Sequence, residues 1–149
     1  MFLLYGELEK EEKMINMKRE EFKKWYPLPN VAPMYLLEEI SHIDGLTITL
    51  KRTKGYDNQG SAECIEVNFP HFVTYTNTDE SYAEGFWIDK HGDAFSFYKT
   101  ENSTYIDFFR KTSVLFDETL QTPVHYVFVA VDSVTHVISD SEPIVREVE

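Results

Sequence analysis

The strongest constraint on the fold is an alternation of apolar and polar residues with period two, which recurs along the chain from residue 35 onward. In "LTITL", Leu46, Ile48 and Leu50 fall on one face of an extended chain. Successive side chains of a strand point to opposite faces of a sheet, so this pattern is typical of half-buried strands. The 11 Phe and 9 Tyr residues favour strands as well. The chain is therefore expected to be rich in sheet.

Turn signals divide these strands into antiparallel neighbours. The segments "MYLLEEIS" and "LTITLKR" flank Asp44-Gly45, which predicts a tight hairpin turn. The segments "CIEVNF" and "FVTYTNT" flank Pro70, which indicates either two strands or one bent edge strand. "VHYVFVAVDS" predicts a central strand that pairs with "VTHVIS" through Asp132-Ser133. The acidic tail "DSEPIVREVE" is expected to be loose.

The segment "FWIDKHGDAFSFYK" places acids and a histidine between two aromatic stretches. A metal site here would use Asp89, His91 and Asp93. Calcium loops need a distant bidentate Glu, and zinc sites need three or four converging ligands, which this segment lacks. We interpret it as a β-hairpin in which Gly92 takes the positive φ of the turn and Phe95 alternates with its neighbours.

One segment of the strand-rich part predicts a helix, "ENSTYIDFFRKTS". Asn102 or Ser103 can cap its first turn. Asp107 lies near the positive end of the helix dipole, and Arg110 and Lys111 lie near the negative end. These placements favour a single amphipathic helix before the last strand pair.

The chain before the first strand divides into two parts. Residues 7–24 mix charges of both signs with a thin apolar stripe, which predicts a charged helix. The three prolines of "WYPLPNVAP" indicate a stiff, packed connector. We expect a charged N-terminal helix or extension at 1–24 and one domain at 25–149. That domain is of the α+β class, mainly an antiparallel sheet of about eight short strands with one or two helices. Met1, Met14 and Met17 all remain candidate starts.

The net charge of −12 is concentrated in the expected domain. Residues 1–24 hold six Lys or Arg and six Glu, whereas residues 25–149 hold eight Lys or Arg and 20 Asp or Glu. This excess disfavours nucleic acids and acidic membranes and attracts a basic partner. The single cysteine, Cys64, fits a reducing compartment, and no apolar stretch predicts a membrane span, so we expect a cytoplasmic protein.

Motifs of known chemistry are missing from the sequence. It has no glycine-rich phosphate loop, nucleophile elbow or HExxH motif, and its paired acids are adjacent, so they point to opposite strand faces. Cys64 has no basic flank that would activate a thiol. We therefore expect no catalytic residue, metal or cofactor. His125 and His136 lie in the last strand pair and could approach each other, so they offer an alternative ligand or enzyme site.

Acids and aromatic residues are interleaved between Tyr75 and Asp93. Aromatic anchors in an acidic field are suited to gripping a basic protein. The candidate partner-binding residues are Asp79, Glu80, Tyr82, Glu84, Trp87, Asp89 and Asp93.

The segments "IEVNFPHFVTYTNTDESY", "NSTYIDFFRKTS" and "VHYVFVAVDSVTHVIS" together resemble small uncharacterised bacterial proteins, some of which are immunity proteins of toxin systems. The resemblance covers roughly residues 35–139 and fixes no functional residue. Together with the net charge of −12, the acidic aromatic stretch and the missing catalytic motif, it leads us to expect an immunity protein that neutralises a basic toxin domain, such as a nuclease, by occluding its active site. A structural or assembly component is a third hypothesis, motivated by the aromatic content and the N-terminal apolar stripe. The oligomeric state stays open.

Overall fold

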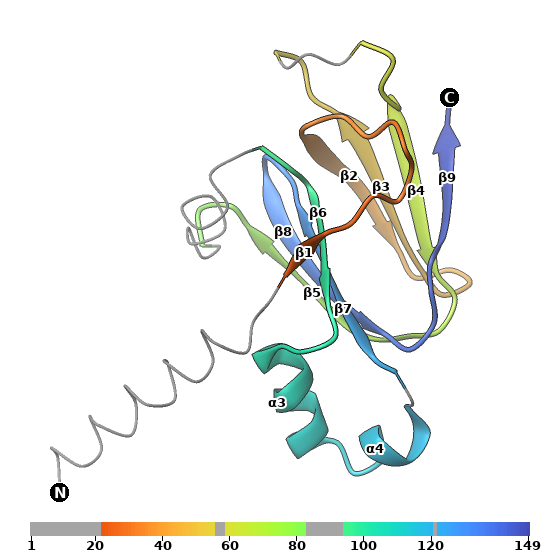
Figure 1. Cartoon of the computed structure of the whole chain (residues 1–149), viewed down its shortest axis with the longest axis vertical. Coiled ribbons are helices and arrows are strands. Elements are labelled where there is room, and N and C mark those ends of the chain that lie inside the picture. Colours follow the sequence, from red (N-terminus) through yellow and green to blue (C-terminus); the bar gives the residue numbers. More distant parts are fainter. Residues whose placement is uncertain (1–21, 56–58, 83–93, 121) are drawn as a thin grey trace, which may run out of the picture.

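The computed structural model describes residues 22–55, 59–82, 94–120 and 122–149. In this part of the chain, nine strands form two antiparallel sheets that pack against each other (Figure 1). The five-stranded sheet has the order β1-β6-β7-β8-β5, and the four-stranded sheet has the order β2-β3-β4-β9. The strands are β1 (Lys23–Lys24), β2 (Tyr35–Ser41), β3 (Leu46–Arg52), β4 (Cys64–Phe69), β5 (Phe72–Asp79), β6 (Phe97–Thr100), β7 (Val124–Val129), β8 (Ser133–Ser139) and β9 (Ile144–Val148). The expected α+β class with mainly antiparallel strands in one small domain is confirmed.

The main core lies between the two sheets. Leu46, Ile48 and Leu50 are buried on β3, as their alternation predicted. The ring of Phe69 on β4 packs edge-on against Tyr126 of the other sheet, with centroids 5.1 Å apart. Large apolar side chains from both inner faces therefore bury one shared layer, which is the dominant favourable term in folding.

The predicted turns are confirmed where the structure describes them. Asp44 and Gly45 have φ angles of 54° and 88°, which join β2 to β3 through a turn with two positive φ values. The chain turns at Pro70 and leaves β4 for β5 in the other sheet, so this segment is two strands. β7 and β8 form the expected hairpin, in which Val127 lies opposite His136.

The expectation of a loose tail is wrong. Residues Ile144–Val148 form β9, which pairs antiparallel with β4 and places Val145 opposite Val67. Val145 packs against the core, and Arg146 forms an ion pair with Glu66. The free edge of β4 provides backbone hydrogen-bond partners for this polar segment. The composition of the segment alone does not reveal that such an edge is present.

Two expectations for β1 and for the segment around β6 also need correction. Lys23 and Lys24 form β1 beside β6 instead of ending a helix. Phe95 and its three successors are all buried, so they do not alternate between core and solvent as a half-exposed hairpin strand would. β6 lies between β1 and β7, and the sheet is covered on both faces there. The rest of the expected N-terminal helix and the turn at Asp89–Asp93 lie outside the described residues.

Two helices connect β6 to β7, α3 (Thr104–Thr112) and α4 (Phe116–Thr119). In Figure 1 both lie at the lower end of the five-stranded sheet. Ile106 of α3 and Phe116 of α4 form a second buried cluster with Ile138 of β8. Ser103 caps α3, because its Oγ accepts a hydrogen bond from the backbone N–H of Ile106 at 3.1 Å. Neither described helix is long and apolar enough to cross a membrane.

Candidate functional site: an acidic surface and a histidine pair

Three of the predicted partner-binding residues lie together where β5 ends. The backbone N–H of Tyr82 donates to the carbonyl of Asp79 at 3.0 Å, and the N–H of Ser81 donates to the Asp79 carboxylate at 2.9 Å. This turn exposes Asp79 and Glu80 and leaves the Tyr82 ring 84% exposed. The other predicted residues, Glu84, Trp87, Asp89 and Asp93, lie outside the described residues.

The β7–β8 turn extends this surface. The backbone N–H of Glu80 donates to the carbonyl of Asp132 at 3.0 Å, which fixes the two turns side by side. Asp132 is exposed, and Val131 beside it is 41% exposed. We call Asp79, Glu80, Tyr82, Val131 and Asp132 together the acidic aromatic surface. Sequence reasoning missed the last two, because their proximity depends on the pairing of β5 with β8.

The acidic aromatic surface is held in place by both sheets. One carboxylate oxygen of Asp132 accepts a hydrogen bond from the N–H of Leu37 at 3.2 Å, and the N–H of Val131 donates to the carbonyl of Tyr35 at 3.0 Å. The N–H of Leu37 and the carbonyl of Tyr35 both lie on β2, which belongs to the four-stranded sheet. Three carboxylates and one phenol ring are thus presented from a rigid support, which lowers the entropic cost of binding.

The second candidate site is a hydrogen-bonded pair of histidines on the other face of the five-stranded sheet from Tyr126. His125 of β7 and His136 of β8 are diagonal neighbours in the register, and the Nε2 of His125 lies 2.8 Å from the Nδ1 of His136. The Nδ1 of His125 lies 2.8 Å from the Oγ of Ser103. The two histidine rings are in contact, as their positions in the hairpin predicted. The contact between Ser103 and His125 was not predicted from the sequence.

Aromatic rings enclose this pair. The ring of Tyr105 on α3 lies 5.0 Å from that of His125 and 5.8 Å from that of His136, and Phe22 lies 5.2 Å from His125 on another side. His125 is 2% exposed, and His136 is half-buried. Burial, and secondly the proximity of His136, hold the pKa of His125 well below its usual range. His125 is therefore neutral in the folded protein near pH 7.

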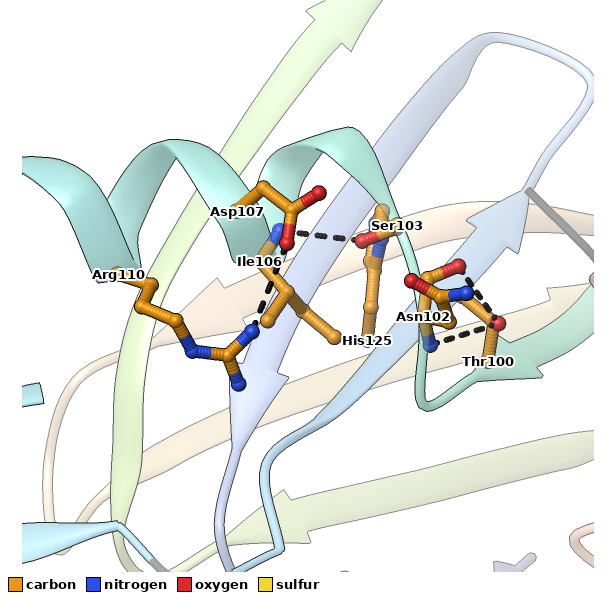
Figure 2. Close-up of polar contacts among 7 residues, drawn as sticks. All are labelled: Thr100, Asn102, Ser103, Ile106, Asp107, Arg110 and His125. Atoms are coloured by element: carbon orange, nitrogen blue, oxygen red, sulfur yellow. Dashed lines mark hydrogen bonds and ion pairs between the residues drawn. The ribbon is translucent and has the colours of Figure 1, made fainter. Parts of the chain in front are cut away.

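The role of Ser103 limits what the pair can do chemically. Figure 2 shows the hydroxyl of Ser103 between the backbone of Ile106 and the ring of His125. This serine is 1% exposed and caps α3, so its Oγ is not open to a substrate. The chain of hydrogen bonds from Ser103 to His136 is thus an internal polar network. A ligand would have to approach it through the half-buried His136.

Cys64 lies on the outer face of the four-stranded sheet, on the polar side that alternation predicted. It is a free thiol and half-buried, and its Sγ lies 3.9 Å from a carboxylate oxygen of Glu38. Burial and this carboxylate raise the pKa of the Cys64 thiol, which disfavours the nucleophilic thiolate. Within the described ranges, no three His, Cys, Asp or Glu side chains are arranged to hold a metal ion.

Comparison of the chain with known protein families, curated proteins and solved structures finds no match. The resemblance to immunity proteins therefore stays a hypothesis.

Proposed function

We propose that this protein binds a basic protein through the acidic aromatic surface, and that it acts as an immunity protein that neutralises a toxin domain. The observation that carries the proposal is the exposed Tyr82 ring beside three exposed carboxylates, those of Asp79, Glu80 and Asp132. An aromatic anchor surrounded by charge of one sign is suited to a partner of the opposite sign.

Long-range electrostatics support a basic partner. The 20 acids of residues 25–149 outnumber the eight basic residues there, so the field of the whole domain is negative. Such a field raises the rate of encounter with a positively charged protein and repels nucleic acids. The local surface and the overall charge therefore favour the same class of partner.

The proposed mechanism is occlusion. A nuclease binds phosphates through a positive active site, and the carboxylates of the acidic aromatic surface would occupy that site in place of the phosphates. Tyr82 and Val131 would contribute the apolar contact that keeps the complex together once it has formed. A cytoplasmic location suits this role, and the single cysteine is compatible with it.

Titration calorimetry against the product of the adjacent gene tests the proposal. We expect tight binding that weakens as salt rises, because exposed charges are screened. Simultaneous reversal of Asp79, Glu80 and Asp132 to Lys should weaken binding at least tenfold more than a matched triple reversal. Tyr82→Ala should cost about 1–2 kcal/mol of binding free energy, as expected for an anchor residue.

The matched control reverses Glu63, Glu147 and Glu149 to Lys. These three glutamates are exposed. Glu63 immediately precedes β4 of the other sheet, Glu147 lies on β9, and Glu149 immediately follows β9. The control changes the net charge by the same amount, so it separates local contact from the overall field. Equal weakening by the two triple variants would remove the acidic aromatic surface from the proposal, and no binding to the adjacent product would reject the immunity role.

A further inference from the structure

A cavity of about 320 Å³ opens between the two sheets, where β6 and β7 face the start of β9. It shares no residue with the acidic aromatic surface and lies on the opposite face of the five-stranded sheet from the histidine pair. Its lining combines an indole, a phenol, a cation and an anion: Trp25, Tyr126, Lys99 and Glu142. Its volume is at the lower end of the roughly 300–1,000 Å³ of ligand pockets, so it suits a small ligand.

Tyr126 provides a hydroxyl donor at the cavity, without a partner in the described part of the chain. Its side chain is 2% exposed, and its hydroxyl has no hydrogen-bond partner among the residues that the structure describes. Burial and the charge of Glu142 raise the pKa of Tyr126 to about 12, so the phenol keeps its proton. A phenol hydroxyl can donate one hydrogen bond, so this O–H is suited to an acceptor that enters the cavity.

Lys99 supplies a positive charge beside this phenol. It lies opposite Tyr126 in the β6–β7 register and opposite Lys23 in the β1–β6 register. Like charges directly opposite each other on a sheet repel. Neither lysine forms an ion pair within the described ranges. A carboxylate placed near Lys99 and Tyr126 would therefore relieve the repulsion and accept the phenol hydrogen bond.

The same lining also carries a negative charge. Glu142 is exposed and is without an ion-pair partner in the described part of the chain, so it can accept an ammonium group. Trp25 packs edge-on against Tyr126 with ring centroids 5.0 Å apart. Pro27 and Pro143, from the two connecting segments, also line the cavity. A ligand with one carboxylate, one ammonium group and an apolar part matches this lining.

We propose that this cavity binds a small zwitterion of the class of free amino acids and dipeptides. The carboxylate of the ligand lies against Lys99 and the Tyr126 hydroxyl, its ammonium group lies against Glu142, and its apolar part contacts Trp25. A phosphorylated ligand fits less well, because Glu142 and the negative field of the domain oppose added negative charge. A purely cationic ligand is opposed by Lys99.

Nuclear magnetic resonance of the full chain tests the proposal directly. The probes are pools of the common L-amino acids and of their glycyl dipeptides at millimolar concentration. The readout is the indole N–H signal of Trp25, assigned with the help of the Trp87→Phe variant. We expect at least one pool to shift the Trp25 signal in a saturable way. The active compound should bind at least tenfold more weakly after its amine is acetylated or its carboxylate amidated.

Three variants then locate the ligand in the cavity: Lys99→Met, Glu142→Gln and Tyr126→Phe. Each should weaken binding of the active compound about tenfold or more. The controls Lys51→Met and Glu63→Gln change exposed charges elsewhere and should leave binding unchanged. Tyr126→Phe removes only an unpartnered hydroxyl, so its fold should survive, as thermal unfolding would verify. No shift with any pool, or binding that all three cavity variants leave unchanged, would overturn the proposal.

Discussion

The Nε2 of His125 and the Nδ1 of His136 lie 2.8 Å apart, a distance that holds one proton between the two rings. One ring must donate and the other must accept, so the two facing nitrogens cannot both carry hydrogens. The Nδ1 of His125 lies 2.8 Å from the Oγ of Ser103, so both ring nitrogens of the buried His125 have partners. A neutral His125 can make both contacts with one N–H donor and one acceptor nitrogen.

This neutral state makes stability depend on pH. The folded pKa of His125 is lowered, while an unfolded histidine titrates near about 6.5. Below that value the unfolded chain binds a proton that the folded chain does not. The free energy of unfolding should therefore fall as pH drops from about 7 towards the lowered pKa, by up to about 1.4 kcal/mol per pH unit from this group. Urea unfolding at a series of pH values measures the slope.

The variant His125→Gln isolates that contribution. It removes the titrating group, so its slope between pH of about 7 and 5 should be shallower than that of the wild type by close to one proton. His71→Gln, which replaces an exposed histidine in the Pro70 turn, serves as the comparison variant. Equal slopes for the wild type and His125→Gln would contradict the assignment of the buried neutral histidine.

Ser103→Ala should destabilise the protein by about 2–3 kcal/mol. The change removes the cap of α3 and leaves the Nδ1 of His125 buried without a partner, and both losses are costly. Ser113→Ala, at the exposed other end of α3, should stay within about 0.5 kcal/mol of the wild type. Denaturant unfolding compares the two variants, and similar losses for both would argue against a special role of Ser103.

Gly45→Ala should cost more than about 2 kcal/mol of stability. A Cβ on Gly45 would lie 2.6 Å from the carbonyl oxygen of Phe69 and 2.9 Å from the Cα of Pro70, in addition to the strain of a positive φ. Gly60→Ala is the matched variant, since it has φ of 76° but open space around the new Cβ. It should cost only about 1 kcal/mol. Thermal unfolding that ranks Gly60→Ala as the more harmful change would refute this packing of the turn.

The ion pair between Arg146 and Glu66 should contribute little. The Nη2 of Arg146 lies 2.9 Å from an oxygen of Glu66, but the arginine side chain is largely exposed. A double-mutant cycle with alanine at both positions should give a coupling energy of about 0.2–1 kcal/mol, lower at high salt. Val145→Ala, which trims the core contact of β9, should cost more than that coupling. The reverse order would indicate that charge rather than burial holds β9.

Local patterns were sufficient to predict much of the fold. The period of two in β3, the Asp44-Gly45 turn and the cap at Ser103 each depend on neighbours in sequence, and all three are confirmed. The pairing of β9 with β4 depends on a strand about 80 residues away, which no local pattern encodes. Its polar residues looked like a solvated tail because only part of one face is buried.

The candidate sites divide in the same way. Asp79, Glu80 and Tyr82 are adjacent in the sequence, and their acidic aromatic character could be recognised there. Asp132 joins them only through the packing of two turns. The residues that line the cavity come from segments far apart in the sequence, and none of these segments carries a recognisable motif. The cavity could therefore not be predicted from the sequence. The approach of His125 to His136 was predictable because a single hairpin sets it.

The position of β9 has a consequence for how the chain acquires its structure. The four-stranded sheet draws β2, β3 and β4 from the first half of the chain and its last member from residues 144–148. During synthesis, the edge of β4 that pairs with β9 stays unpaired until residues 144–148 have been made, after the strands β5 to β8 of the five-stranded sheet. Folding should therefore be slow for a chain of this size, since so many contacts join distant residues. A chaperone that shields the β4 edge would raise the yield more than one that assists the helices.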